Sequence, residues 1–218
     1  YAEFFGDNNF YSKGLKKAGW NASDVITNCT PLQQAWAQEN SINGQGLEIT
    51  LEQIRREKPE VLYFQDMNLM TKTFLEAVRP YTKLIAGQIA TPIQKKIPFS
   101  SYDVIFSSFP HYVEKFRNIG LTCYYQPLAF DPDILEAIAQ FEYSERSVAC
   151  SFVGGISSLH IESYKLLEEL ARKTPIQLWG YGVDSTKKDS VIRKLHNGPA
   201  WGREMFSILS SSRININR

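Results

Sequence analysis

Short apolar runs alternate with amphipathic stretches along most of this chain. Runs such as Val61-Leu62-Tyr63-Phe64 have the length and composition of strands buried on both faces. Between the runs, apolar residues recur every three or four positions, which is the period of an amphipathic helix. We predict strands at residues 61–64, 83–87, 102–107, 121–126, 148–153 and 176–179, and helices at 71–78, 111–118 and 159–172. Strands separated by helices predict parallel sheets and the α/β class.

The first sixty residues predict helices for the most part. Asp7 is placed to cap a helix over residues 8–18, and two further helices are expected at 32–38 and 50–58. A short strand is expected at 24–27. The final twenty residues indicate a Gly/Pro loop, one short helix and a strand in which Asn alternates with Ile.

One stretch breaks the alternation and suggests a boundary. Residues 127–145 carry Asp131-Pro132-Asp133, one short helical segment and a charged exit. We therefore predict an N-terminal α/β domain at residues 1–130, a linker at 131–146, and a second, incomplete α/β domain at 147–218.

The composition argues against several classes of binding partner. The 218 residues include 24 basic and 23 acidic side chains, and no basic tract of five or more residues occurs. Electrostatic binding to nucleic acid or to an anionic membrane is therefore disfavoured. No apolar run approaches the roughly 18 residues of a membrane span, so no transmembrane segment is expected. Three widely spaced cysteines among apolar neighbours indicate reduced, buried thiols rather than a metal site, and hence a cytoplasmic protein.

Three loops that follow predicted elements of the second domain are rich in glycine. Ligands bind open parallel sheets at the carboxyl ends of the strands, and glycine lets a phosphate or a ring approach the backbone closely. The candidate residues are Gly154, Gly155, Ser157, Gly180, Tyr181, Gly182, His196, Gly198, Pro199, Ala200 and Trp201. A tight turn explains the first two of these loops equally well when each is taken alone, and the recurrence of glycine in all three favours a ligand.

The corresponding positions of the first domain carry mainly neutral polar side chains. Amide and hydroxyl groups suit ligands rich in hydroxyls, such as sugars. The candidates here are Asp66, Asn68, Gln88, Thr91, Ser107 and His111. Asp66 and His111 are the clear acid/base candidates, although a helix cap and an exposed helix start explain them as well. The patterns H-E-x-x-H, G-x-S-x-G and G-x-G-x-x-G are absent, which argues against metalloprotease, serine hydrolase and dehydrogenase activities.

Several motifs together resemble the CgeB-like (spore maturation protein type) glycosyltransferases. The motifs span nearly the whole chain, and their order and spacing are more specific than any one of them. They are Phe5-Gly6-Asp7, Phe10-Tyr11-Ser12, Asn28-Cys29, Pro31-Leu32-Gln33, Gly87-Gln88-Ile89-Ala90-Thr91-Pro92, Pro127-Leu128-Ala129-Phe130-Asp131, Ser151-Phe152-Val153-Gly154-Gly155 and the segment 198–217.

The resemblance implies a GT-B fold of two Rossmann-like domains with a cleft between them and no bound metal or other cofactor. A UDP- or GDP-type sugar donor would lie on the second domain, with the three glycine-rich loops as its site. Asn68, Thr91 and Ser107 would border a hydroxyl-bearing acceptor, and His111, Asp66 and Gln88 would be catalytic. Compared with the family, we expect the chain to be truncated at both ends, which makes activity of this fragment doubtful. A binding module without turnover, made of two α/β lobes that hold a sugar or a sugar nucleotide, is the alternative.

Overall fold

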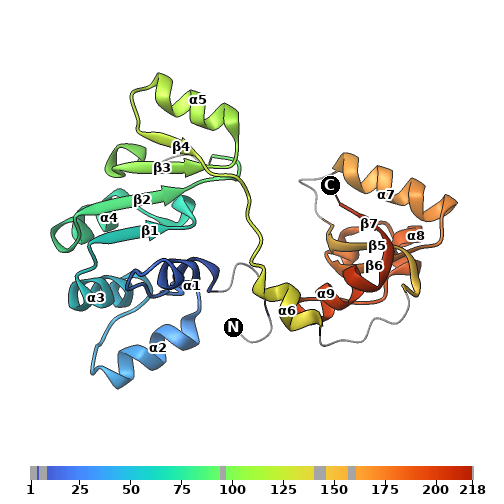
Figure 1. Ribbon diagram of the computed structural model, residues 1–218, viewed down its shortest axis with the longest axis horizontal. Helices are drawn as coiled ribbons and strands as arrows, with labels where there is room; N and C mark the ends of the chain where they lie inside the picture. Colours follow the sequence, from blue (N-terminus) through green and yellow to red (C-terminus); the bar gives the residue numbers. More distant parts are fainter. Residues whose placement is uncertain (1–3, 5–8, 94–96, 140–145, 157–160, 218) are drawn as a thin grey trace. The chain divides into compact units, whose positions relative to one another are not determined.

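The computed structural model describes residues 4, 9–93, 97–139, 146–156 and 161–217, apart from the side chains of 161–163 (Figure 1). Contacts divide the chain into two compact units. The four-stranded unit comprises Ser23–Phe130, and the three-stranded unit comprises Tyr1–Ala22 together with Asp131–Arg218. Both are mixed α/β units with parallel sheets, which confirms the predicted α/β class, while the GT-B arrangement stays a prediction.

The four-stranded unit alternates strands with helices, as the apolar pattern predicts. Its strands pair in parallel in the order β1-β2-β3-β4. The strands are β1 (Val61–Phe64), β2 (Leu84–Gln88), β3 (Val104–Ser107) and β4 (Cys123–Tyr125). The helices are α2 (Thr30–Glu39), α3 (Leu47–Glu57), α4 (Lys72–Val78) and α5 (Pro110–Asn118), with 3₁₀ turns at Met67–Leu69, Arg79–Tyr81 and Phe99–Ser101.

The core of this unit joins its helices to one face of the sheet. Phe74 of α4 and Phe116 of α5 are buried in one cluster with Ile85 and Ile105 of the central strands. Because the strand order follows the chain order, right-handed crossovers carry the connecting helices to the same face. A single cluster under α3, α4 and α5 is the result.

The three-stranded unit has the strand order β6-β5-β7, again all parallel. The strands are β5 (Val148–Gly155), β6 (Ile176–Tyr181) and β7 (Ser212–Ile216). The helices are α1 (Phe10–Lys17), α6 (Asp133–Ala139), α7 (Ile161–Lys173), α8 (Val191–Leu195) and α9 (Gly202–Ser211), with a 3₁₀ turn at Val183–Ser185. Leu178 and Phe152 of the sheet pack with Leu167 of α7 and Ile192 of α8.

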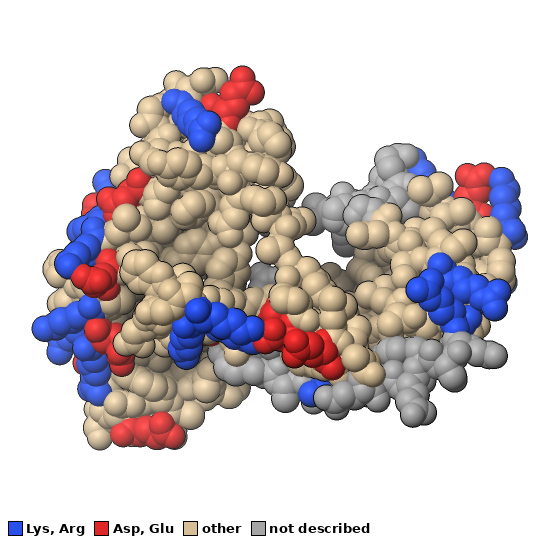
Figure 2. All heavy atoms as spheres, viewed as in Figure 1, with Lys and Arg blue, Asp and Glu red and all other residues tan. Residues whose placement is uncertain are grey.

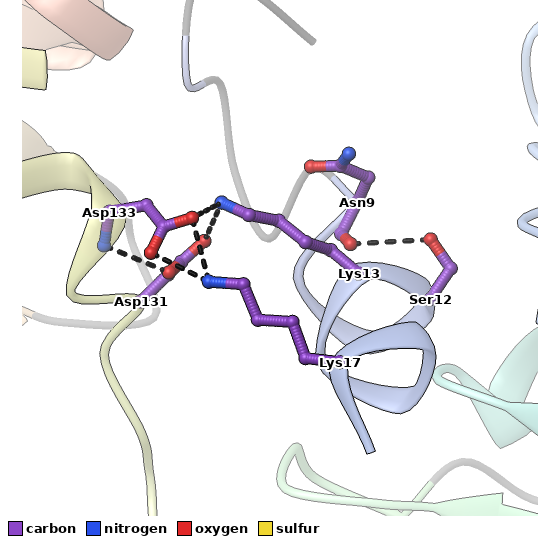
Figure 3. Close-up of polar contacts among 6 residues, drawn as sticks. All are labelled: Asn9, Ser12, Lys13, Lys17, Asp131 and Asp133. Atoms are coloured by element: carbon purple, nitrogen blue, oxygen red, sulfur yellow. Dashed lines mark hydrogen bonds and ion pairs between the residues drawn. The ribbon is translucent and has the colours of Figure 1, made fainter. Parts of the chain in front are cut away.

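The grouping of α1 with the C-terminal half differs from the predicted domain division. Lys13 contacts Asp131 at 2.8 Å and Asp133 at 2.5 Å, and Lys17 contacts Asp133 at 2.8 Å (Figure 3). These ion pairs join α1 to the start of α6, inside the segment predicted to be a linker. The predicted short helix is present there as α6, and its Ile134 is buried. Ion pairs between positions more than 100 residues apart have no periodic signal, so the pattern could not show them.

Two local predictions need correction. The strand expected at 24–27 is irregular chain and turn, and its Val25 and Ile26 are exposed. A β-branched pair without a neighbouring strand to bond has no reason to stay extended. Helix α8 was not expected, because its five residues are too few to show a helical period. The proposed Asp7 cap lies outside the described residues.

Charged side chains are unevenly distributed on the face of the four-stranded unit seen in Figure 2. Basic and acidic side chains alternate along its left margin, whereas the middle of the face is formed by uncharged residues. Within the described part of the chain, no helix is both long and apolar enough to cross a bilayer.

Candidate functional site

The carboxyl edge of the three-stranded sheet is the first candidate site. β5 lies at the centre, the chain leaves it towards β6 on one side, and β7 returns on the other. The direction of winding therefore reverses at β5, and open α/β sheets bind ligands at such a reversal, outside the carboxyl ends of the strands. Gly154 and Gly155 end β5 at this edge.

The glycine-rich segments predicted to converge lie side by side here, but the first two are strand ends rather than loops, since Gly154 and Gly155 belong to β5 and Gly180 and Tyr181 belong to β6. The Gly180 N–H at the end of β6 donates to the Gly198 carbonyl oxygen at 2.9 Å. His196 Nε2 lies 3.1 Å from the Gly180 carbonyl oxygen. The Asn197 N–H donates to the Leu178 carbonyl oxygen at 2.8 Å. The chain after α8 thus runs as a short parallel extension along the outer side of β6.

An aromatic pair stands beside these strand ends. Tyr181, the last residue of β6, stacks on Trp201 with ring centroids 5.1 Å apart and planes inclined by 21°. Both remain accessible, with exposed fractions of 54% for Tyr181 and 45% for Trp201. Trp201 immediately precedes α9, so the loop from His196 to Trp201 delivers its indole to the sheet edge.

Glycine is required at Gly180, and the absence of a side chain at Gly155 lets a neighbouring ring approach. Gly180 has a φ of +129°, and a Cβ atom there would collide with the Gly154 carbonyl oxygen of the neighbouring strand. At Gly155 a Cβ atom would enter the ring of Tyr181, at 2.6 Å from its hydroxyl oxygen. The two strands therefore come as close as they do, and Tyr181 lies across the end of β5, because neither glycine has a side chain.

The remaining predicted residues of this edge vary in accessibility. Pro199 is exposed, whereas Ala200 is only 2% exposed and belongs to the interior rather than to a ligand-facing wall. Gly182 has a φ of +82° and leads into the 3₁₀ turn that follows β6. Ser157 lies outside the described residues.

The carboxyl edge of the four-stranded sheet forms the second candidate site. Asn68 Nδ2 donates to Thr91 Oγ1 at 2.9 Å, and the Tyr112 hydroxyl donates to the Thr91 carbonyl oxygen at 3.1 Å. Thr91 thus joins the loops that follow β1 and β2 to the first turn of α5. The buried Oδ1 atom of Asn68 has no hydrogen-bond partner among the described residues.

The three predicted catalytic residues lie on separate elements of this edge. Gln88 ends β2, and its Oε1 accepts a hydrogen bond from the Tyr63 hydroxyl. The exposed Asp66 carboxylate accepts from the Asn68 backbone N–H at 2.9 Å. His111 stacks on Phe109 at 5.4 Å at the start of α5. Among the described residues no hydrogen bond or ion pair connects Asp66 with His111, so the structure does not bring them together as an acid/base pair.

Ser107 is the predicted acceptor-side residue whose environment is structural. It is fully buried, its hydroxyl donates to the Ile89 carbonyl oxygen at 2.6 Å, and it accepts from the Phe109 N–H at 3.1 Å. A hydroxyl with both roles used inside the sheet edge does not face an acceptor. The sequence pattern placed it at the strand end correctly but could not show that the loop closes over it.

Pattern reasoning missed several tyrosines of this edge. Tyr63 orients Gln88, and Tyr112 binds the loop of Thr91. The ring of Tyr102 packs against Gly87, and its buried hydroxyl has no hydrogen-bond partner among the described residues. Burial, with a smaller contribution from the Asp66 charge, raises the pKa of Tyr102 above its ordinary value. Tyr112 could have been found, since it follows His111 directly at a predicted helix start.

The described residues and the comparison with known proteins assign neither a metal nor a family to the chain. Within the described ranges, no three His, Cys, Asp or Glu side chains gather as a metal-ligand group. No known protein family matches the chain, and neither does any curated protein.

Proposed function

We propose that this chain is part of a glycosyltransferase that takes its sugar from a nucleotide-diphosphate donor bound to the three-stranded unit. The observation that carries the proposal is the accessible indole of Trp201 beside the glycine ends of β5 and β6. An aromatic face can stack a nucleobase, and glycine-lined backbone lets a diphosphate come close. A nucleotide sugar combines these two requirements in one molecule.

The four-stranded unit is assigned to the acceptor. The Asn68–Thr91 pair and the Gln88 amide offer neutral hydrogen-bonding groups, which suit the hydroxyls of a carbohydrate or a similar acceptor. In the transfer, an acceptor oxygen bonds to the anomeric carbon while the bond from that carbon to the diphosphate oxygen breaks. The acceptor proton passes to a base, for which His111 and Asp66 are the candidates. The diphosphate leaves with the electron pair of the broken bond.

Calorimetry of the whole chain with UDP, GDP and NAD tests the donor assignment. We expect UDP or GDP to bind and NAD not to bind. Base stacking contributes roughly 1–3 kcal/mol, so Trp201→Ala should weaken nucleotide binding by about 5- to 150-fold. Trp20→Ala is the matched control, because Trp20 is 62% exposed in the same unit but lies outside this edge. Binding of NAD alone would overturn the proposal.

A second candidate function is a sugar-nucleotide binding module without turnover. It is favoured by the absence of a hydrogen bond or ion pair between Asp66 and His111 among the described residues. Release of UDP or GDP from a sugar nucleotide, measured with and without hydroxyl acceptors, separates the two. Turnover that is lost in His111→Ala and Gln88→Ala supports the transferase, whereas tight binding with no turnover supports the module.

A further inference from the structure

Tyr181 lies over the diglycine end of β5. Gly155 and Tyr181 are register partners in the parallel β5–β6 ladder, so their side-chain positions project from the same face of the sheet. Gly155 has no side chain, and the Tyr181 ring occupies the space that a Cβ atom would take. Any group that approaches Gly155 from this face therefore meets the tyrosine ring first.

The same ring covers part of Trp201. The 5.1 Å centroid separation and the 21° interplanar angle are those of a stacked pair, the arrangement that a nucleobase would adopt on the indole. One tyrosine thus occupies two positions that a nucleotide diphosphate needs, namely the surface of Gly155 and a stacking position on Trp201.

Tyr181 can leave this position at small cost. It ends β6, it is 54% exposed, and the next residue, Gly182, has a φ of +82°. The buried core of the unit does not include its ring. The interactions to be lost are its stacking on Trp201 and its contact with the Gly155 backbone. A stacked aromatic pair contributes about 0.5–1.5 kcal/mol, which corresponds to a factor of roughly 2 to 12 in an equilibrium constant.

We propose that Tyr181 gates the nucleotide site: its ring must turn away from Gly155 and Trp201 before the diphosphate and the base of a donor can bind. The inference rests on the proposed function, since it names the residue that controls access to the donor site. It makes Tyr181 a competitor of the ligand rather than part of the surface that holds it.

The test compares whole-chain variants by calorimetry with UDP, with GDP and with inorganic pyrophosphate. Tyr181→Ala removes the ring and should tighten, by about 2- to 12-fold, the binding of pyrophosphate and of UDP or GDP. Tyr181→Phe keeps the stacked ring and should bind as the parent chain does. Tyr125→Ala is the matched control, because Tyr125 is also 54% exposed but ends β4 of the other unit.

The outcomes distinguish a failure of the gate proposed for Tyr181 from a failure of the proposed nucleotide-donor function. Unchanged or weaker UDP or GDP binding by Tyr181→Ala overturns the gate and leaves the donor site in place. Tighter pyrophosphate binding by Tyr181→Ala, with neither UDP nor GDP bound by any variant, supports the gate and refutes the nucleotide donor. If pyrophosphate, UDP and GDP all fail to bind any variant, the gate and the donor site are both refuted.

Discussion

Replacing Gly180 by alanine should separate β5 from β6. The backbone at Gly180 has a φ of +129°, and the new Cβ atom would collide with the Gly154 carbonyl oxygen. A backbone oxygen cannot rotate away as a side chain can, so the two strands must move apart. We expect loss of hydrogen bonding at the carboxyl edge, where the Gly180 N–H also donates to Gly198.

The magnitude follows from two separable costs. The left-handed backbone conformation costs an L residue roughly 1–2 kcal/mol, and forcing a methyl group into occupied space adds about 1–3 kcal/mol. Gly198→Ala isolates the first cost, because Gly198 has a φ of +111° but no atom lies within 4 Å of its Cβ position. The entropy that alanine removes from the unfolded chain is common to both variants and cancels in the comparison.

Urea denaturation measures the difference. With a slope of about 1.5 kcal/mol per molar urea, Gly180→Ala should lower the midpoint of the three-stranded unit by roughly 2 M and Gly198→Ala by about 1 M. Amide exchange in peptides from β5 and β6 assigns the transition to its unit when the two units unfold separately. Equal midpoints for the two variants would refute the collision on which the reasoning depends.

Three further predictions concern the packing of both units. Ser107→Ala should destabilise the four-stranded unit by about 1–3 kcal/mol, because it leaves the buried Ile89 carbonyl oxygen and the half-buried Phe109 N–H without the Ser107 hydroxyl, whereas the neighbouring Ser108→Ala should change the urea midpoint little. Tyr102→Phe should raise the midpoint of the same unit by roughly 0.5–1 M, because it removes a buried hydroxyl without a partner among the described residues; a lower midpoint would show that the hydroxyl is bonded. Hydrogen bonds from Lys13 and Lys17 lower the pKa of the Asp133 carboxyl. The stability that these bonds add to the folded chain is therefore complete above the ordinary pKa of an aspartate and is lost as the pH falls below about 4. Urea midpoints at pH 5 and pH 3 should therefore differ less in Asp133→Asn than in the parent chain, and equal differences would contradict the assignment.

The sequence predicted the strands well where a local physical reason acts. Four apolar residues between polar breaks, as at Val61–Phe64, are too short a run for a helix and form a strand as predicted, although β1 lies at the sheet edge and its Val61 is 50% exposed. The glycines also located the edge of Gly155, Tyr181 and Trp201 before their contacts were known, but Gly155 and Tyr181 end strands rather than lie in loops. It failed at residues 24–27, where β propensity has no partner strand to act with.

What the sequence alone determined is the position of most strands and helices, because periodicity and turn chemistry are local, whereas the ends of β5 and β6 and the short helix α8 were not predicted. Only the tertiary structure decided that α1 belongs with the C-terminal half through Lys13 and Asp131, that Ser107 is enclosed, and that Tyr181 lies over Gly155 and against Trp201. These are contacts between positions far apart in the chain or choices of side-chain direction. Neither produces a periodic pattern in the sequence, because each depends on how helices and strands that have already formed pack against one another.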